Sequence, residues 1–204
     1  MVPFVKRCAR KVRNALFLPL LIRDALYCWI HGIRWHYSWR FWKLPRIRRY
    51  RGGSISIGKH FTACSDLAHN PLGATQPVIL YAQFNGKLVI GDHVGITGSS
   101  ICCSNHISIG NNVLIGPGCS IFDSDGHSIH PEERLTGLSS SNPIFIENDV
   151  FVGTKCIILK GVRIGEGSII AAGSVVMDSV PPFTIVAGNP AQKYRRKKQA
   201  EESR

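Results

Sequence analysis

Residues 146–176 read IENDVFVGTKCIILKGVRIGEGSIIAAGSVV, and every sixth position in this stretch is a branched aliphatic residue. These positions are Ile146, Val152, Ile158, Ile164, Ile170 and Val176. The residue four places after each of them is compact, namely Val150, Cys156, Val162, Ser168, Ser174 and Val180. A six-residue step fits neither the 3.6-residue period of a helix nor the two-residue period of a strand. The repeat therefore predicts flat coils wound around a narrow apolar axis, which is a β-helix.

The same register continues upstream to Ile109, and shorter stretches of it begin at Ile57 and Ile90. The spacing between Ile96 and Ile109 is thirteen, one more than two repeats, so we expect one residue to bulge out there. Residues 123–143 interrupt the repeat and are rich in Asp, Ser, Gly, His and Pro, which predicts a loop that leaves the coil and returns in nearly the same phase. An ordinary sandwich or barrel of short strands would alternate at two and has no reason to hold a six-residue phase.

Three segments carry a resemblance to known proteins. Residues 126–134, GHSIHPEER, resemble the loop of the galactoside, maltose and nodulation-factor acetyltransferases, a branch of the hexapeptide-repeat acyltransferases. Residues 171–176, AAGSVV, and residues 187–191, AGNPA, are similar to the end of the coil in that branch. The resemblance spans about residues 53–196. It implies an all-β, left-handed parallel β-helix, assembled as a homotrimer, with acetyl-CoA bound as co-substrate in the grooves between subunits.

His127 is the candidate catalytic base. An alcohol attacks a thioester when a base removes its proton, and imidazole, with a reference pKa of about 6.5, suits that task near neutral pH. The resemblance gives this role to the first histidine of the loop, with direct transfer from acetyl-CoA. A thiol ionises at about 8.5, so its thiolate leaves readily and no covalent enzyme intermediate is needed. From the residues alone, an ordinary loop histidine is the alternative.

The base needs a carboxylate or a carbonyl on its second ring nitrogen. Asp125 lies two residues away, on the same side of an extended chain, and Asp123 lies four residues away. Either could instead be a solvated loop acid. His130 could line the acceptor pocket or be a plain surface histidine. Arg134 could bind sugar hydroxyls or, with the glutamates at 132–133, tie the loop down by ion pairs.

Acetyl-CoA needs two kinds of contact. Its pantetheine arm is a long amide chain that must come close to exposed backbone groups of the protein, and small side chains allow this approach. Its phosphates require cations. The resemblance places Thr154 and Ala172 along the arm and Arg195 at a phosphate. The full set of expected contacts is Thr154, Ala172, Gly173, Ser174, Lys193 and Arg195. The alternative is that the small residues merely fit coil corners. The chain departs from the branch at three positions. The branch often has a hydroxyl residue, a lysine and an arginine where this chain has Met177, Asp178 and Gln192, respectively.

The composition suits one core with an appendage, because the chain has 204 residues, of which 44% are hydrophobic and 20 are glycine. We expect a β-helix over residues 53–188, a basic aromatic segment over 1–52 and a basic tail over 189–204.

Seven cysteines without a CxxC pair indicate packed, reduced thiols in a cytoplasmic protein. A γ-class carbonic anhydrase, the rival enzyme on this fold, would need three histidines at a zinc, and we expect no metal.

The positive charge is concentrated at the start of the chain. Residues 1–51 hold thirteen Lys and Arg against one acid, Asp24, and they also contain all four tryptophans. Their longest charge-free stretches are nine residues each, whereas a bilayer span needs about 20. The pattern is typical of a segment lying on an anionic membrane surface. A cap on the coil is the alternative, and nucleic-acid binding is not expected because no nucleic-acid fold accompanies the charge.

These observations predict an O-acetyltransferase acting on a sugar hydroxyl. A membrane-surface segment favours an acceptor at the membrane, such as a growing surface polysaccharide or a lipid-linked sugar, with the protein peripheral on the inner face. A small free sugar, an amine or a xenobiotic remains open as acceptor. A non-catalytic membrane-associated scaffold is the alternative of a different class.

Overall fold

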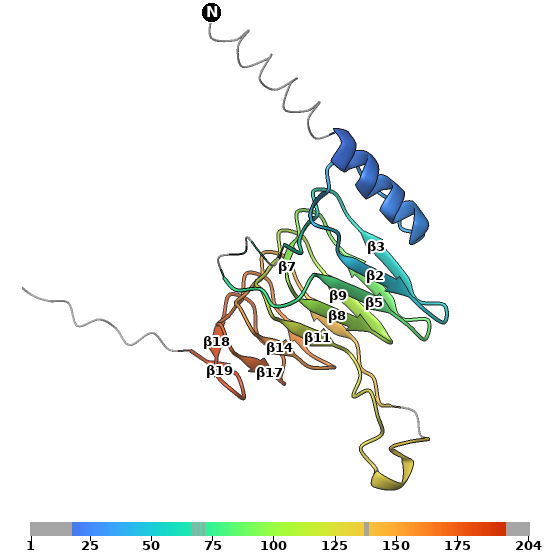
Figure 1. Ribbon diagram of the computed structural model, residues 1–204. Helices are drawn as coiled ribbons and strands as arrows, with labels where there is room; N and C mark the ends of the chain where they lie inside the picture. Colours follow the sequence, from blue (N-terminus) through green and yellow to red (C-terminus); the bar gives the residue numbers. More distant parts are fainter. Residues whose placement is uncertain (1–17, 67, 69, 71, 137–138, 195–204) are drawn as a thin grey trace, which may run out of the picture.

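The computed structural model describes residues 18–66, 68, 70, 72–136 and 139–194, and it consists mainly of short parallel strands in three sheets (Figure 1). Sheet A contains, in spatial order, β1 (Arg40–Trp42), β4 (Thr62–Cys64), β7 (Gly95–Thr97), β10 (Leu114–Ile115), β13 (Phe151–Val152), β16 (Ile169–Ile170), β18 (Ile185–Ala187) and β19 (Gln192–Lys193). Sheet B contains β17 (Val175–Val176), β14 (Ile157–Ile158), β11 (Ser120–Phe122), β8 (Ser100–Cys103), β5 (Ile79–Ala82) and β2 (Arg46–Arg49). Sheet C contains β15 (Arg163–Ile164), β12 (Ile144–Ile146), β9 (His106–Ile109), β6 (Lys87–Ile90) and β3 (Ser54–Ile57).

From β1 to β17, consecutive strands belong to sheets A, B and C in turn, so each complete coil contributes one strand to each sheet, and β18 and β19 end the chain of strands in sheet A. The strands of neighbouring coils pair in parallel, and β18 with β19 is the one antiparallel pair among the named strands. A six-residue repeat is therefore one face of a three-sided coil together with one corner. The predicted parallel β-helix is confirmed.

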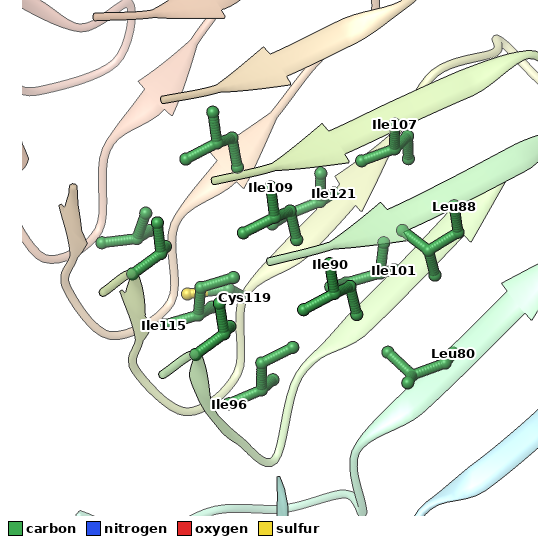
Figure 2. Packing of buried hydrophobic residues seen from close by; sticks show 14 of the residues in the cluster. Leu80, Leu88, Ile90, Ile96, Ile101, Ile107, Ile109, Ile115, Cys119 and Ile121 are labelled. Atoms are coloured by element: carbon green, nitrogen blue, oxygen red, sulfur yellow. The ribbon is translucent and has the colours of Figure 1, made fainter. Parts of the chain in front are cut away.

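The repeat residues form the core. Each of the six aliphatic positions from Ile146 to Val176 is at most 2% exposed. Coils pair in register, so like side chains stack along the axis, as Ile109 does on Ile90 and Ile121 on Ile101 (Figure 2). Burying a side chain of this size is worth about 1.5–3 kcal/mol. The stack of such side chains is the principal stabilising feature of the fold.

The thirteen-residue spacing before Ile109 is accommodated differently from the single bulge that the sequence predicts. Strand register aligns Ile96 with Ile115 and Ile101 with Ile121, so the step from Ile96 to Ile101 is five residues and the step from Ile101 to Ile109 is eight. The shortened corner contains Gly98 at φ +42°, where an added Cβ would lie 2.7 Å from the Cβ of Ala74. Only glycine fits this corner, and the next corner takes up the extra residues.

The coil begins earlier than the boundary expected at residue 53. Strand β1 pairs with β4 and strand β2 pairs with β5, and both Phe41 and Ile47 are buried in the core. These two residues are themselves six apart, in phase with the repeat. Arginines occupy the outward positions of the first coil, including Arg40, Arg46 and Arg48, and in the sequence they make this coil look like part of the basic aromatic segment. Residues 1–17 lie outside the described part of the chain.

Residues 18–30 form a helix that lies at the end of the stack formed by the first coils (blue in Figure 1). Within the described residues, no helix combines the length and the hydropathy needed to span a bilayer.

At the corners between sheets C and A, side-chain oxygens link successive coils. The Asp92, Asn111 and Asn148 side chains accept the backbone N–H groups of Lys59, Asp92 and Asn111 at 2.6, 2.8 and 2.8 Å.

Candidate active site

Residues 123–143 connect β11 to β12 and form the loop that projects from the edge between sheets B and C (yellow in Figure 1). The loop starts at Asp123, which is fully buried and accepts the backbone N–H groups of Ser104 and Asn105 at 2.7 and 2.8 Å. An isolated antiparallel bridge joins Ser124 to Ser141. These contacts anchor the two ends of the loop to the coil.

A charged pair holds the next part of the loop against the following coil. The Lys160 ammonium donates to the Asp125 carboxylate and, at 2.9 Å, to the Ser140 hydroxyl. The backbone N–H of Asp125 also donates to the Ser140 carbonyl at 3.1 Å. Lys160 lies 35 residues from Asp125 in the sequence, and the stacking of coils brings the two together.

His127 is exposed on this loop, and its Nδ1 atom lies 3.2 Å from the main-chain oxygen of Arg134. A carbonyl oxygen can only accept a hydrogen bond, so this contact requires the proton to be on Nδ1. In the neutral ring, Nε2 then has a free lone pair. The contact therefore prepares Nε2 to accept a proton.

The two candidate orienting carboxylates have other partners in the structure. Asp123 accepts backbone N–H groups and Asp125 binds Lys160, so the hydrogen-bond partner of His127 Nδ1 is neither of them. A carbonyl, the other kind of partner considered, takes their place at Arg134. The identity of a residue does not indicate where its carbonyl points, so the sequence had no signal for this contact.

The remaining polar residues of the loop bond to one another. The loop contains a short 3-10 helix, η1 (Pro131–Glu133), and the Ser128 hydroxyl donates to the Glu133 carboxylate at 3.2 Å. Ser128 also accepts the backbone N–H of His130 at 3.2 Å, and the His130 side chain is exposed. The Arg134 guanidinium donates to the Ile129 carbonyl at 3.3 Å. Glu133 therefore has the structural role expected of the glutamates, and Arg134 closes the loop through both its side chain and its carbonyl.

Thr154, Ala172 and Gly173 lie at successive corners between sheets A and B. The Gly173 N–H donates to the Thr154 carbonyl at 2.8 Å. The corners are closely stacked, because a Cβ added to Gly153 would lie 2.7 Å from the Ala172 nitrogen. Outside Gly173, by contrast, an added Cβ would meet no atom within 4 Å. The edge thus presents backbone and small side chains to open space, which suits an extended amide chain.

Ser174 differs from its neighbours at this edge. Its side chain is fully buried, where its hydroxyl donates to the Ala171 carbonyl at 2.6 Å and accepts the Gly188 N–H at 3.2 Å. The hydroxyl links two coils and is not presented to a ligand, contrary to its expected place among the cofactor contacts. Lys193 is exposed on β19, and Arg195 lies outside the described residues.

The base and the small-residue edge lie at opposite ends of the sheet B strands. His127 follows β11, whereas Thr154 precedes β14 and Ala172 precedes β17. Strands of one parallel sheet all run in the same direction, so one edge collects their starts and the other edge their ends. One chain therefore does not bring the two groups together.

Within the part of the chain that the structure describes, no group of three or more His, Cys, Asp or Glu side chains is arranged to hold a metal ion.

Comparison with known proteins supports a relationship to acetyltransferases. The family described as bacterial transferase hexapeptide (six repeats) matches residues 143–177. The galactoside O-acetyltransferase of Escherichia coli is 34% identical over 154 residues, which cover 76% of this chain and 60% of that enzyme. A solved hexapeptide-repeat acetyltransferase from Vibrio cholerae is 29% identical with a TM-score of 0.57, and the match covers 85% of this chain and 78% of that one.

A second solved structure, a galactoside acetyltransferase in complex with coenzyme A, is 28% identical with a TM-score of 0.50, and the match covers 78% of this chain and 64% of that one. The chain spans about half the length of the curated relatives it matches, with shares between 43% and 60% for four of them. In its repeats, its fold and these relatives, the chain is similar to the hexapeptide-repeat acetyltransferases.

Proposed function

We propose that this protein is an acyl-CoA-dependent O-acetyltransferase that moves an acetyl group from acetyl-CoA to a sugar hydroxyl. The observation that carries the proposal is the contact between His127 Nδ1 and the Arg134 carbonyl. This contact leaves Nε2 as a proton acceptor on an exposed loop that is anchored at both ends. The relatives named as galactoside O-acetyltransferases support a sugar as the acceptor class.

The reaction proceeds by direct transfer. The acceptor hydroxyl donates a hydrogen bond to Nε2 of His127, and its proton passes to Nε2 as the oxygen attacks the thioester carbon. The tetrahedral intermediate collapses with cleavage of the C–S bond, and the departing thiolate takes the proton from the imidazolium. The products are the acetyl ester and free CoA, and His127 returns to its neutral form. Holding the reactants together in this geometry supplies much of the acceleration.

The donor binds along the corners between sheets A and B. Thr154, Ala172 and Gly173 provide the exposed backbone for the pantetheine arm, and Lys193 provides positive charge for the phosphates. Arg195, beyond the described residues, is proposed as a second phosphate contact. Because His127 and these corners lie at opposite ends of sheet B in one chain, we propose that the site is completed between subunits of a homotrimer. His127 of one subunit then faces the donor edge of its neighbour.

The acceptor is proposed to be a glycan in surface polysaccharide or glycolipid biosynthesis. His130 and Arg134 lie on the same loop as His127 and are the candidates for acceptor-side contacts. A reducing compartment such as the cytoplasm suits the six described cysteines, whose thiols are free. A small free sugar, an amine or a xenobiotic is the alternative acceptor, and a non-catalytic scaffold is the alternative function.

The test is release of CoA thiol from acetyl-CoA by the purified full chain, measured against a panel of glycans and small sugars. We expect release that depends on one acceptor class and that is lost in His127→Asn. The matched control is His60→Asn, at an exposed histidine on another edge of the coil. No release with any acceptor, while the trimer stays folded, would favour the scaffold.

A further inference from the structure

The helix formed by residues 18–30 is fastened to the coil through its polar side. Asp24 is buried, and the neighbouring Arg23 guanidinium donates both to its carboxylate, at 2.8 and 2.5 Å, and to the Phe41 carbonyl, at 3.2 Å. One turn further along, Cys28 is fully buried against the first coil. Tyr27 also joins the helix to the strand that follows Pro45, since Ile47 donates its N–H to the phenol oxygen at 3.1 Å. The helix is therefore a cap on the coil.

The opposite side of the helix is apolar and faces outward. Residues 18, 22, 26 and 29 recur at helical spacing and lie on one face, away from the side of the helix that carries Asp24 and Cys28. The exposed fraction is 60% for Ile22 and 76% for Trp29, and three more large apolar side chains on this side are more than half exposed: Leu18, Leu26 and Ile30. A helix that only covers a core shows the reverse pattern, with its apolar stripe inward and its polar face in water.

Cations border this apolar face. The last turn of the helix and strand β2 together line a surface hollow of about 460 Å³ that includes Trp29, Ile30, Arg48 and Arg49. Arg49 Nε donates to the His31 carbonyl at 3.1 Å, which holds the guanidinium beside the end of the helix. Arg46, Arg48 and Arg51 are exposed nearby, while the single acid of residues 1–51, Asp24, is buried on the other side. The surface therefore combines an apolar centre with an unopposed positive rim.

We propose that this surface, formed by the outer face of the helix and the β2 arginines, attaches the protein to an anionic bilayer. The helix lies parallel to the membrane, with its apolar side chains at the level of the acyl-chain boundary and the arginines on lipid phosphates. The same helix thus caps the coil with one face and binds lipid with the other. The proposal is independent of the proposed acetyl transfer, although it would place a lipid-linked acceptor within reach.

Charge distinguishes the bilayer from other occupants. A second copy docked on this face would bring like-charged arginines together, and like charges without counter-ions oppose association. A nucleic acid would satisfy the arginines but leave the apolar centre of the face against water. Anionic lipid supplies both an apolar interior and negative headgroups, so it alone matches both parts of the surface.

The first experiment removes the apolar contribution. The full chain is sedimented with vesicles of phosphatidylcholine containing phosphatidylglycerol, and with vesicles of phosphatidylcholine alone. We expect binding to the anionic vesicles and a loss of about tenfold or more in partitioning for Ile22→Ser/Leu26→Ser, because two inserted side chains are returned to water. The matched control is Leu72→Ser/Phe183→Ser, which changes two apolar side chains elsewhere that are at least as exposed and should bind as the wild type does.

The second experiment removes charge. Arg46→Gln/Arg48→Gln should weaken binding to anionic vesicles by about fivefold for each arginine and flatten its dependence on salt. The control is Lys59→Gln/Lys87→Gln, at two exposed cations on the coil, and it should leave binding unchanged. Quenching of tryptophan fluorescence by brominated lipid adds a direct readout, which should fall in Trp29→Phe.

Three results would overturn the proposal. One is equal binding of wild type and Ile22→Ser/Leu26→Ser to anionic vesicles, and another is absence of vesicle binding by the full chain. The third is a smaller solution mass for Ile22→Ser/Leu26→Ser in sedimentation velocity, without a change in vesicle binding, which would make the face a contact between copies. None of these measurements uses acetyl-CoA, so they fail or succeed separately from the proposed enzyme activity.

Discussion

The Nδ1 atom of His127 lies 3.2 Å from the main-chain oxygen of Arg134, across the projecting loop of the coil. The contact sets the tautomer of the ring with a backbone atom, where many catalytic histidines use a carboxylate. A carbonyl carries no full charge, so it orients the ring with little electrostatic stabilisation of the imidazolium. Catalysis then depends on the loop keeping its shape.

His127→Asn should lower kcat/KM for acetyl transfer by about 10² to 10⁴, the usual contribution of a positioned general base. Folding should be unaffected because the side chain is exposed and its contact is with the loop alone. Steady-state release of CoA thiol measures the rate, and circular dichroism reports the fold. A variant that retained most of the wild-type rate would exclude His127 as the base.

Lys160→Met should loosen the loop while leaving the coil intact. The ammonium holds both Asp125 and Ser140, but the pair is partly exposed, so the stability lost should be within about 1 kcal/mol. We expect kcat to fall severalfold and limited proteolysis between residues 123 and 143 to accelerate. Lys87→Met, an exposed lysine on a strand, is the control. Unchanged proteolysis in Lys160→Met would mean that the loop is held by its other contacts.

Ala172→Trp should raise the KM for acetyl-CoA, because an indole at this corner would occupy the proposed path of the pantetheine arm. The effect on kcat at saturating donor should be smaller. Glu166→Trp places the same ring at an exposed corner on another edge and should leave the KM unchanged. Equal KM values for Ala172→Trp and the wild type would place the donor elsewhere.

Asp24 should make the stability of the cap depend on pH. Burial is the largest influence on its carboxyl and raises its pKa above the ordinary value, although Arg23 opposes the shift. The folded state therefore binds this proton more tightly than the unfolded state, so the contribution of Asp24 to stability is greatest in acid and is lost as the pH rises through the raised pKa. Asp24→Asn should lose this dependence. Thermal unfolding of both proteins between pH 4 and pH 7 should show the wild-type Tm falling relative to that of Asp24→Asn as the pH rises.

Ile158→Ala should destabilise the coil by about 2–5 kcal/mol, the range for truncating a fully buried side chain. Ile158 is fully buried and stacks in register between Ile121 and Val176. Its neighbour Ile157 points outward, and Ile157→Ala should cost much less. Urea unfolding of the two variants checks the alternation directly. Equal costs would contradict the inward and outward assignment of the two positions.

The six-residue period by itself determined the coil, its core positions and the place of the long loop. This was possible because a coil repeats the same local burial at every step, so the positions from Ile146 to Val176 have one environment and show it in their residue types. The interruption at residues 123–143 was equally visible, because a segment that leaves the coil loses the repeat. The same logic applied to Phe41 and Ile47, but arginines at the outward positions concealed that coil.

The tertiary structure alone decided which atoms meet. Coil stacking brings Lys160 to Asp125 over 35 residues, and this contact has no periodic signature in the sequence. The Arg134 carbonyl that orients His127 is invisible to sequence because every residue has a carbonyl and only the fold directs it. The helix of residues 18–30 is a similar case. Its residues are almost all apolar in sequence, and only its attachment through Asp24 and Cys28 decides which apolar side faces outward.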